Sequence, residues 1–145
     1  MEFAGNWILH GDGVTRPMIR VDVFGADGNR YGGDFLIDTG ADQTVFNAIY
    51  FQRLGFPIIP MPPGSTFVGI GGESEITEAH TTLEFTAVDG ATIHVRGKYA
   101  AFTDPAATAY NILGRDVLDH FDVIVSRRGD QVRLLTGNHY YQILT

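Results

Sequence analysis

Residues 35–42, Phe-Leu-Ile-Asp-Thr-Gly-Ala-Asp, have the types and spacing best suited to chemistry in this chain. An apolar run leads directly into Asp38, which places a carboxylate at the edge of a core, where loss of water disfavours its charged form. Thr39 can fix the loop through its hydroxyl, and Gly40 allows close approach of the backbone. Asp-Thr-Gly alone is a weak signal, because three common turn residues occur by chance in many proteins.

Two further segments carry apolar residues next to glycines. One is Val68-Gly69-Ile70-Gly71-Gly72, at the tip of an expected long hairpin. The other is Asn111-Ile112-Leu113-Gly114-Arg115-Asp116, an apolar strand that leads into an expected helix. The glycines of the first segment fit a loose turn as well as a mobile lid, since both need flexible backbone. The position of this segment relative to Asp38 favours the lid.

Together with Thr15-Arg16-Pro17-Met18-Ile19, these segments resemble the retropepsins, the aspartic proteases of the retroviral type. The catalytic loop, the Gly-Ile-Gly-Gly flap tip and the Ile-Leu-Gly-Arg motif occur in the family's order and at nearly its spacing. The resemblance runs from about Arg16 to Leu118. It implies an all-β, closed-barrel-like retropepsin (acid protease) fold with a flap hairpin and one short C-terminal helix.

The resemblance implies a role for each matching residue. The catalytic loop is Asp38, Thr39 and Gly40, with Asp38 as the catalytic aspartate and the Thr39 hydroxyl bonding across a dimer axis. Asp42 and Arg115 match a structural ion pair, and Arg16 matches an arginine that reaches from the partner subunit towards Asp42. The alternatives are a turn residue for Asp42 and a solvated helix-start residue for Arg115.

The substrate site is likewise assigned by resemblance. Ile70, flanked by Gly69 and Gly71, matches the flap-tip residue whose backbone N–H contacts the substrate carbonyl through a water. The positions that line substrate pockets in the family are Leu36, Ala41, Val45, Tyr110 and Ile112. We therefore expect a peptide or protein substrate, bound as an extended strand under the flap.

One aspartate per chain requires a second chain. Peptide hydrolysis without a metal or a covalent intermediate needs a base to activate water and an acid to protonate the carbonyl oxygen. Two carboxylates about 3 Å apart share one proton and supply both. The tripeptides Ala26-Asp27-Gly28 and Val88-Asp89-Gly90 lack the apolar lead-in and the hydroxyl, and they fit hairpin turns. We therefore expect an aspartic endopeptidase that acts as a homodimer, because a two-fold axis repeats Asp38 on each side.

A non-catalytic homodimeric peptide-binding module with the same fold is the alternative. The intact Asp38, Thr39 and Gly40 argue against it, because binding alone does not need the carboxylate. A second alternative is a precursor that becomes active only after autoprocessing. Neither alternative changes the expected fold.

Composition limits the other classes of function. The 145 residues suit a single domain, 1–145, and the net charge of −7 disfavours nucleic acid as a partner. The chain has no cysteine, and its five histidines are scattered without ligand spacing, so we expect no metal and no cofactor. Neither a signal peptide nor a membrane span is evident, which favours a cytoplasmic location for this segment, although it can be part of a longer protein.

Alternating apolar residues predict strands over most of the chain. We expect hairpins from 18–24 with 31–38, from 65–70 with 73–82, and from 122–126 with 131–135. Residues 81–88 and 92–102 extend the meander, residues 44–54 form a short strand and a helical turn or two, and 114–120 forms the one clear helix. The last hairpin continues past the point where viral members end. We therefore expect different dimer contacts, and a bacterial or cellular origin.

Overall fold

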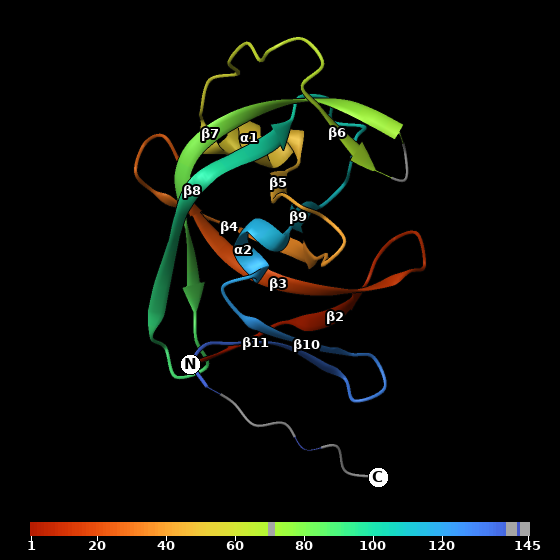
Figure 1. Ribbon diagram of the computed structural model, residues 1–145, viewed down its shortest axis with the longest axis vertical. Helices are drawn as coiled ribbons and strands as arrows, with labels where there is room; N and C mark the ends of the chain where they lie inside the picture. The colour runs from red at the N-terminus through yellow and green to blue at the C-terminus, as the bar shows by residue number, and fades with distance from the viewer. Residues whose placement is uncertain (70–71, 139–141, 143–145) are drawn as a thin grey trace.

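The structure, a computed structural model, describes residues 1–69, 72–138 and 142. Strands dominate this part of the chain, as predicted (Figure 1). The elements, in chain order, are β1 (Glu2–Ala4), β2 (Asn6–Leu9), β3 (Thr15–Phe24), β4 (Arg30–Ile37), β5 (Val45–Phe46), α1 (Ala48–Leu54), β6 (Thr66–Gly69), β7 (Gly72–Thr86), β8 (Thr92–Phe102), β9 (Asn111–Leu113), α2 (Arg115–Leu118), β10 (Asp122–Ser126) and β11 (Gln131–Leu135).

The larger sheet closes on itself. Its strand order is β2-β3-β4-β9-β5-β8-β7-β6, and β3 also pairs with β7 through Asp22 with Glu84 and Val23 with Leu83. That extra pairing joins two strands from distant places in the sheet order, so the sheet curls into a barrel around the core. The expected closed-barrel-like fold is therefore present.

Strand β9 is inserted between β4 and β5, and this insertion positions the site. β9 runs parallel to β4, with Ile37 opposite Leu113, and antiparallel to β5, with Val45 opposite Ile112. Two parallel strands cannot be joined by a tight hairpin. The connection from β4 to β9 is accordingly long and contains β6, β7 and β8. The loop after β4 and the helix after β9 consequently leave the sheet at the same end.

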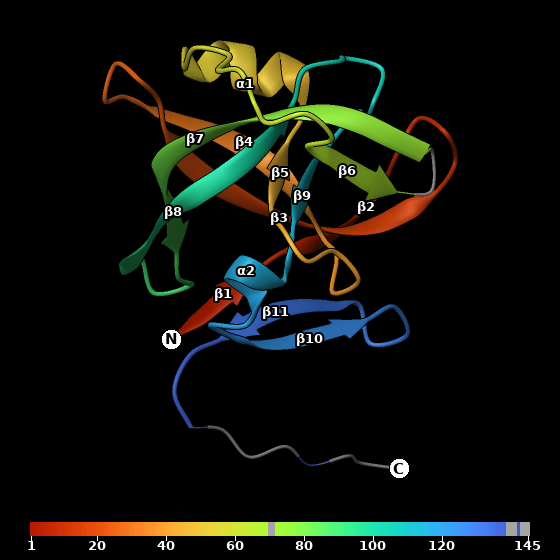
Figure 2. The ribbon, with the colours of Figure 1, turned by 45° about the horizontal axis from the view of Figure 1, so that its top comes forward.

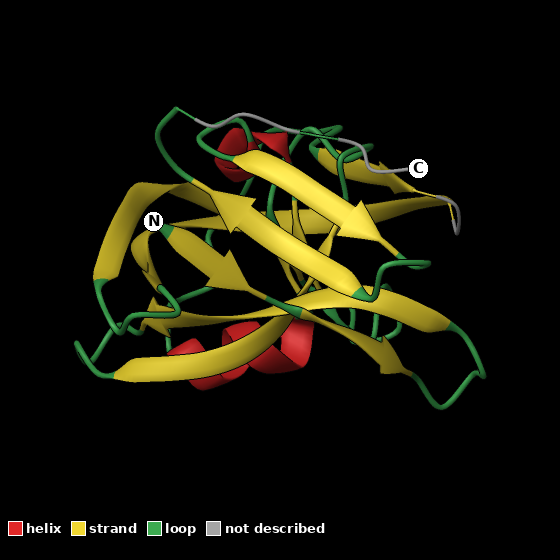
Figure 3. Ribbon diagram, turned by 90° about the horizontal axis from the view of Figure 1, so that it is seen from below, coloured by secondary structure: helices red, strands yellow, loops and turns green. Residues whose placement is uncertain are grey.

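The three-stranded sheet combines both ends of the chain. Its order is β1-β11-β10, and Figure 3 shows it on the underside of the barrel. β10 and β11 match the predicted C-terminal hairpin, whereas β1 and β2 were not predicted. The Trp7 indole of β2 donates a hydrogen bond to the Ser126 carbonyl at 3.0 Å, and Gly5 N–H donates to Val132 at 2.8 Å, so the two sheets are joined.

The described part of the chain has two short helices: α1 lies in the segment where a helical turn or two was expected, and it is longer than α2, which lies in the expected helix at 114–120. The Asn47 side chain caps α1 by accepting the Tyr50 N–H at 2.7 Å, and Gly55 ends it with a φ of 80°. α2 covers Arg115–Leu118 and stops before His120, the predicted end. No helix in the described part of the chain has the length and apolar character needed to cross a membrane.

The barrel interior contains a group of packed aromatic rings beside its aliphatic residues. Phe46 packs against Phe35, Tyr50 and Tyr99 with ring centroids 5.9–6.0 Å apart, mostly edge to face. α1 contributes Tyr50, Phe51 and Leu54 to this core, which explains why the helix lies across one mouth of the barrel (Figure 2). The core thus fixes the strands that carry the loop at residues 38–44.

The predicted flap hairpin corresponds to β6 and the first part of β7, with Thr66 opposite Glu75 and Gly69 opposite Gly72. Its tip residues, Ile70 and Gly71, lie outside the described residues. The sequence prediction split residues 73–88 into two segments, but β7 is one strand of 15 residues. It pairs with β6 and then with β3, while β8 lies along its other edge.

Candidate active site

Asp38 lies directly after β4 and opens a tight turn. Its backbone N–H donates to the Leu113 carbonyl at 3.1 Å, and its own carbonyl accepts the Ala41 N–H at 3.2 Å. Its carboxylate oxygen Oδ1 accepts the Gly40 N–H at 3.0 Å. Asp38 is half-buried, whereas Thr39 and Gly40 are exposed. The turn therefore fixes one carboxylate oxygen of Asp38 and presents Thr39 to the surface.

Gly40 leaves room for the Asp38 carboxylate. A Cβ at this position would lie 3.2 Å from Asp38 Oδ1, a tight contact that the Asp38 side chain would relieve by shifting a few tenths of an ångström. Any side chain here would press on the carboxylate oxygen that the Gly40 N–H binds. Glycine at this position of the Asp-Thr-Gly tripeptide thus avoids a steric contact with the Asp38 carboxylate.

The first turn of α2 holds the far side of the loop that follows Asp38. The Arg115 N–H donates to the Ala41 carbonyl at 2.8 Å, and the Asp116 N–H donates to the Asp42 carbonyl at 3.2 Å. The N–H groups at the start of a helix have no partner within the helix. Here the loop carbonyls accept them, so the loop and α2 form one unit.

A buried hydroxyl network completes this unit. Thr44 is fully buried, and its hydroxyl donates to Asp116 Oδ1 at 2.7 Å while accepting the Gly114 N–H at 3.0 Å. The Thr44 N–H donates to the same carboxylate oxygen at 2.9 Å. Sequence reasoning missed both Thr44 and Asp116 as supports of the site. The only signal was a hydroxyl residue shortly after the loop and an acidic residue after Gly-Arg.

Gly114 permits the contact between loop and helix. A Cβ on Gly114 would lie 2.4 Å from the carbonyl carbon of Gln43 and 2.5 Å from its oxygen. These are backbone atoms that cannot swing aside, so only glycine fits between β9 and α2. The Leu-Gly-Arg segment therefore has a physical role in docking the loop that follows Asp38.

The structure brings Asp42 and Arg115 together in an ion pair, the partners named from the sequence. Both side chains are largely exposed, so the pair adds little to stability. Asn111, the first residue of β9, is buried and connects two other segments: its Oδ1 accepts the Asn47 N–H at 2.9 Å, and its Nδ2 donates to the Asp34 carbonyl at 3.4 Å.

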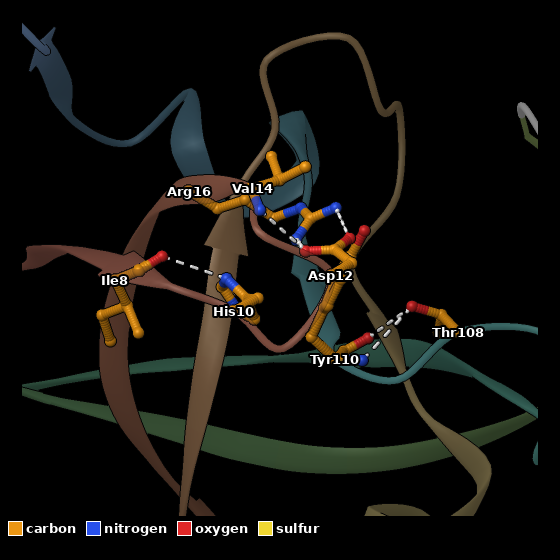
Figure 4. A network of polar contacts seen from close by, with 7 residues as sticks. All are labelled: Ile8, His10, Asp12, Val14, Arg16, Thr108 and Tyr110. Atoms are coloured by element: carbon orange, nitrogen blue, oxygen red, sulfur yellow. Dashed lines mark hydrogen bonds and ion pairs between the residues drawn. The ribbon is translucent and has the colours of Figure 1, made fainter.

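Arg16 has a partner within its own chain. Its guanidinium binds both carboxylate oxygens of Asp12, at 3.0 and 2.7 Å, and lies 5.0 Å from the centre of the Tyr110 ring (Figure 4). The ring of His10 packs edge-on against the same tyrosine at 5.6 Å. The Arg16 guanidinium lowers the pKa of Asp12 to about 2. Tyr110 is thus held between two side chains of the loop and strand that follow β2.

The expected pocket residues Leu36, Val45 and Ile112 form one row across three strands. Leu36 of β4 lies opposite Ile112 of β9, which lies opposite Val45 of β5. Residues directly opposite one another in a sheet point to the same face. Leu36 and Ile112 are half-buried and Val45 is fully buried, so of this row only Leu36 and Ile112 leave apolar surface accessible.

Comparison with known proteins bears on this geometry. The family model described as "Aspartyl protease" matches residues 19–117, which contain the Asp38 loop, both flap strands and the start of α2. The chain belongs to the aspartyl protease family. No match was found among curated protein sequences.

Solved structures place the chain among retropepsin-like folds. A retropepsin-like aspartic protease from Rickettsia conorii is 18% identical with a TM-score of 0.57, covering 92% of this chain and 97% of that one. The EIAV protease in complex with the inhibitor HBY-793 is 23% identical with a TM-score of 0.49, covering 77% of this chain and 92% of that one. The expected retropepsin-like fold is confirmed.

This member of the aspartyl protease family has a second apolar cluster that the sequence did not reveal. Val45 and Ile112 pack with residues from the flap strands, from β8 and from the loop after it, namely Phe67, Ile76, Ala100, Phe102 and Ala107. The Phe67 and Phe102 rings meet edge to face with centroids 5.5 Å apart. The flap strands therefore pack on the same apolar row.

The remaining predicted residues fall in different places. Ala41 is buried, and its carbonyl accepts the Arg115 N–H at 2.8 Å. Gly69 is the last residue of β6, while Ile70 and Gly71 lie outside the described residues. No group of three or more metal-binding side chains occurs among the residues that the structure describes.

Proposed function

We propose that this chain is an aspartic endopeptidase whose active site is completed by a second copy, so that two Asp38 carboxylates face one another. The observation that carries the proposal is the placement of Asp38. It is half-buried at the end of β4, with one carboxylate oxygen held by Gly40, next to an apolar row. The neighbouring Thr39 is exposed, as a residue that meets a partner chain must be.

The chemistry follows from two carboxylates that share one proton. The ionised carboxylate takes a proton from water as the water oxygen attacks the peptide carbonyl, and the protonated one donates its proton to the carbonyl oxygen. The resulting tetrahedral diol then collapses: the carboxyl that took the water proton gives it to the amine as the C–N bond breaks, and the other carboxylate takes a proton from a diol hydroxyl, which restores the starting pair. A single carboxylate cannot be base and acid in the same step, so the monomer is expected to be inactive.

The substrate is a peptide in extended form with apolar side chains beside the cleaved bond. The apolar row and the cluster under the flap strands support this preference, because buried apolar surface favours apolar side chains. Cleavage of a peptide library tests it. Predominance of charged residues beside the cleaved bond would contradict it.

The decisive experiment compares wild type with Asp38→Asn for peptide cleavage between about pH 3 and 8, the range over which carboxylate pairs titrate. Asp34→Asn is the matched control, since Asp34 is an exposed aspartate on β4, the strand that leads into Asp38. We expect activity in the wild type and the control and none in Asp38→Asn. Equal activity in all three refutes the protease, and inactivity in all three favours the peptide-binding module.

Mixing tests the shared site. Adding excess Asp38→Asn chain to a fixed amount of wild type converts active dimers to mixed dimers. If each site needs two aspartates, the activity falls towards zero as mutant chain is added. If one aspartate is enough, the activity remains in proportion to the wild-type chain, and the two-copy site is wrong.

A further inference from the structure

β8 has a free edge along most of its length. It pairs with β7 on one side from end to end, but β5 joins its other side only at Ala100 and Ala101. Within the described residues, one further bond reaches the backbone of 92–98, from the Tyr99 hydroxyl to the Val95 carbonyl at 2.8 Å. In Figures 1 and 2 the lower part of β8 lies at the left border of the molecule, with no element drawn beyond it. Such an edge offers N–H and C=O groups to an added strand.

The side chains along this edge form two different faces, because successive residues of a strand point to opposite sides of the sheet. His94, Arg96 and Lys98 are exposed on one face. Ile93 and Val95 lie on the other face, where they are half-buried and pack against the core. The edge therefore presents a basic face and an apolar face.

Arg96 is the basic residue of this face that has no acidic partner among the described residues. The residue opposite it on β7 is Thr82, and its neighbours on the same face of β8 are His94 and Lys98. Each of these two neighbours already contacts a glutamate of β7, at 2.7 Å for the histidine and 3.3 Å for the lysine. The guanidinium of Arg96 is therefore available to an acidic group from outside the chain.

A hollow of about 490 Å³ lies at this part of the two strands, and none of its lining residues is acidic. It is lined by His80, Thr81, Thr82, Arg96, Gly97 and Lys98. His80 stands directly opposite Lys98, so three basic side chains border the hollow. The chain as a whole has a net charge of −7, which makes this basic surface an exception that attracts a negative partner.

The charges also indicate which kind of strand this edge accepts. Antiparallel pairing with β8 of a second copy would bring the basic residues of one copy opposite those of the other, and like charges directly opposite are destabilising. An acidic strand meets attraction instead. Residues opposite one another in a sheet have Cβ atoms about 4.5–5.5 Å apart, close enough for a carboxylate to reach Arg96 or Lys98.

We propose that the free edge of β8 binds an extended peptide segment of a protein partner in which acidic and apolar residues alternate. The segment adds a strand to the sheet, and its backbone bonds to residues 92–98. Its acidic side chains contact Arg96 and Lys98, and its apolar side chains lie beside Ile93 and Val95. No group of the Asp38 loop takes part, so this inference stands apart from the proposed function.

A fluorescently labelled peptide of alternating glutamate and valine tests the proposal. Its fluorescence anisotropy is measured with the full Asp38→Asn chain, so that cleavage cannot consume the probe. We expect binding that weakens as salt is added. Adding Arg96→Glu should raise the dissociation constant about tenfold, since a repulsion replaces an attraction. Arg128→Glu makes the same charge change at an exposed arginine after β10, and it should leave the constant unchanged.

A second peptide, of alternating lysine and valine, separates charge pairing from a loss of folding. It should bind the chain that carries Arg96→Glu more tightly than the chain that keeps Arg96, the reverse of the order for the glutamate peptide. A variant that merely unfolds would bind neither peptide. The same order for both peptides would show that Arg96 does not contact the bound segment, and the proposal would be wrong.

Hydrogen exchange locates the bound glutamate–valine peptide. Amides within residues 92–98 should gain protection when the peptide is added. Absence of binding, an unchanged dissociation constant in Arg96→Glu, or protection confined to the flap strands would each overturn the proposal. Self-association of the chain that Arg96→Glu abolishes would assign this edge to a second copy, which also contradicts it. Cleavage that depends on Asp38 would be unaffected by any of these results.

Discussion

Replacing Thr44 with valine should loosen the catalytic loop from α2. Valine has nearly the shape of threonine but no hydroxyl. The substitution removes the donor to Asp116 at 2.7 Å and leaves the buried Gly114 N–H without its acceptor at 3.0 Å. The Thr44 N–H still binds Asp116, so the carboxylate keeps one partner.

The cost follows from these two bonds. A hydrogen bond to a charged group contributes about 1.5–3 kcal/mol, and a buried donor without a partner costs about 1–3 kcal/mol. The valine methyl regains part of this because it is more apolar than the hydroxyl. We expect the free energy of unfolding to fall by about 3 kcal/mol.

Urea unfolding at pH 7 measures this loss, with protein concentration held fixed because dimer formation also stabilises the fold. Thr44→Ser is the matched control. It keeps the hydroxyl and loses one methyl, for about 1 kcal/mol. If valine costs no more than serine, the hydroxyl network does not stabilise the loop, and our account of how α2 supports Asp38 is refuted.

Three other substitutions probe the site and the core. Gly114→Ala should lower the melting temperature strongly, since the new Cβ meets the Gln43 backbone at 2.4 Å; an unchanged melting temperature would contradict the close contact. Asp42→Asn should cost less than about 1 kcal/mol in urea unfolding, because its ion pair is exposed, and a larger loss would show a deeper role. Burial raises the pKa of Tyr99 above its ordinary value of 10.0, so its neutral form favours the fold, and stability is lost as the pH rises through that value. Tyr99→Phe should therefore lose less stability than wild type between about pH 9 and 11, and an equal loss in both would contradict this reasoning.

The strand and turn around Asp38 could be predicted because the information for them is local. An apolar strand, an aspartate and a glycine are adjacent in the chain, and their side-chain types alone suggest a carboxylate at the edge of a core. The C-terminal hairpin was predicted for the same reason, from alternation over residues 122–126 and 131–135. The α1 helix was underrated because its signals, an Asn47 cap and a Gly55 end, are short and are offset by aromatic residues with modest helix propensity.

Sequence alone therefore determined which residues could do chemistry and that one chain supplies a single Asp-Thr-Gly. Tertiary structure decided which residues support the Asp-Thr-Gly loop. Thr44 and Asp116 are far apart in the chain, and only the parallel pairing of β4 with β9 brings the helix after β9 to the loop after β4. Tertiary structure also decided which apolar residues lie on the same face of the sheet as Val45. Strand register depends on which strands pair, and alternation within one strand does not specify its partner. Arg16 is an example. The sequence showed an arginine at this position, but its ion pair with Asp12 depends on how the chain turns between β2 and β3.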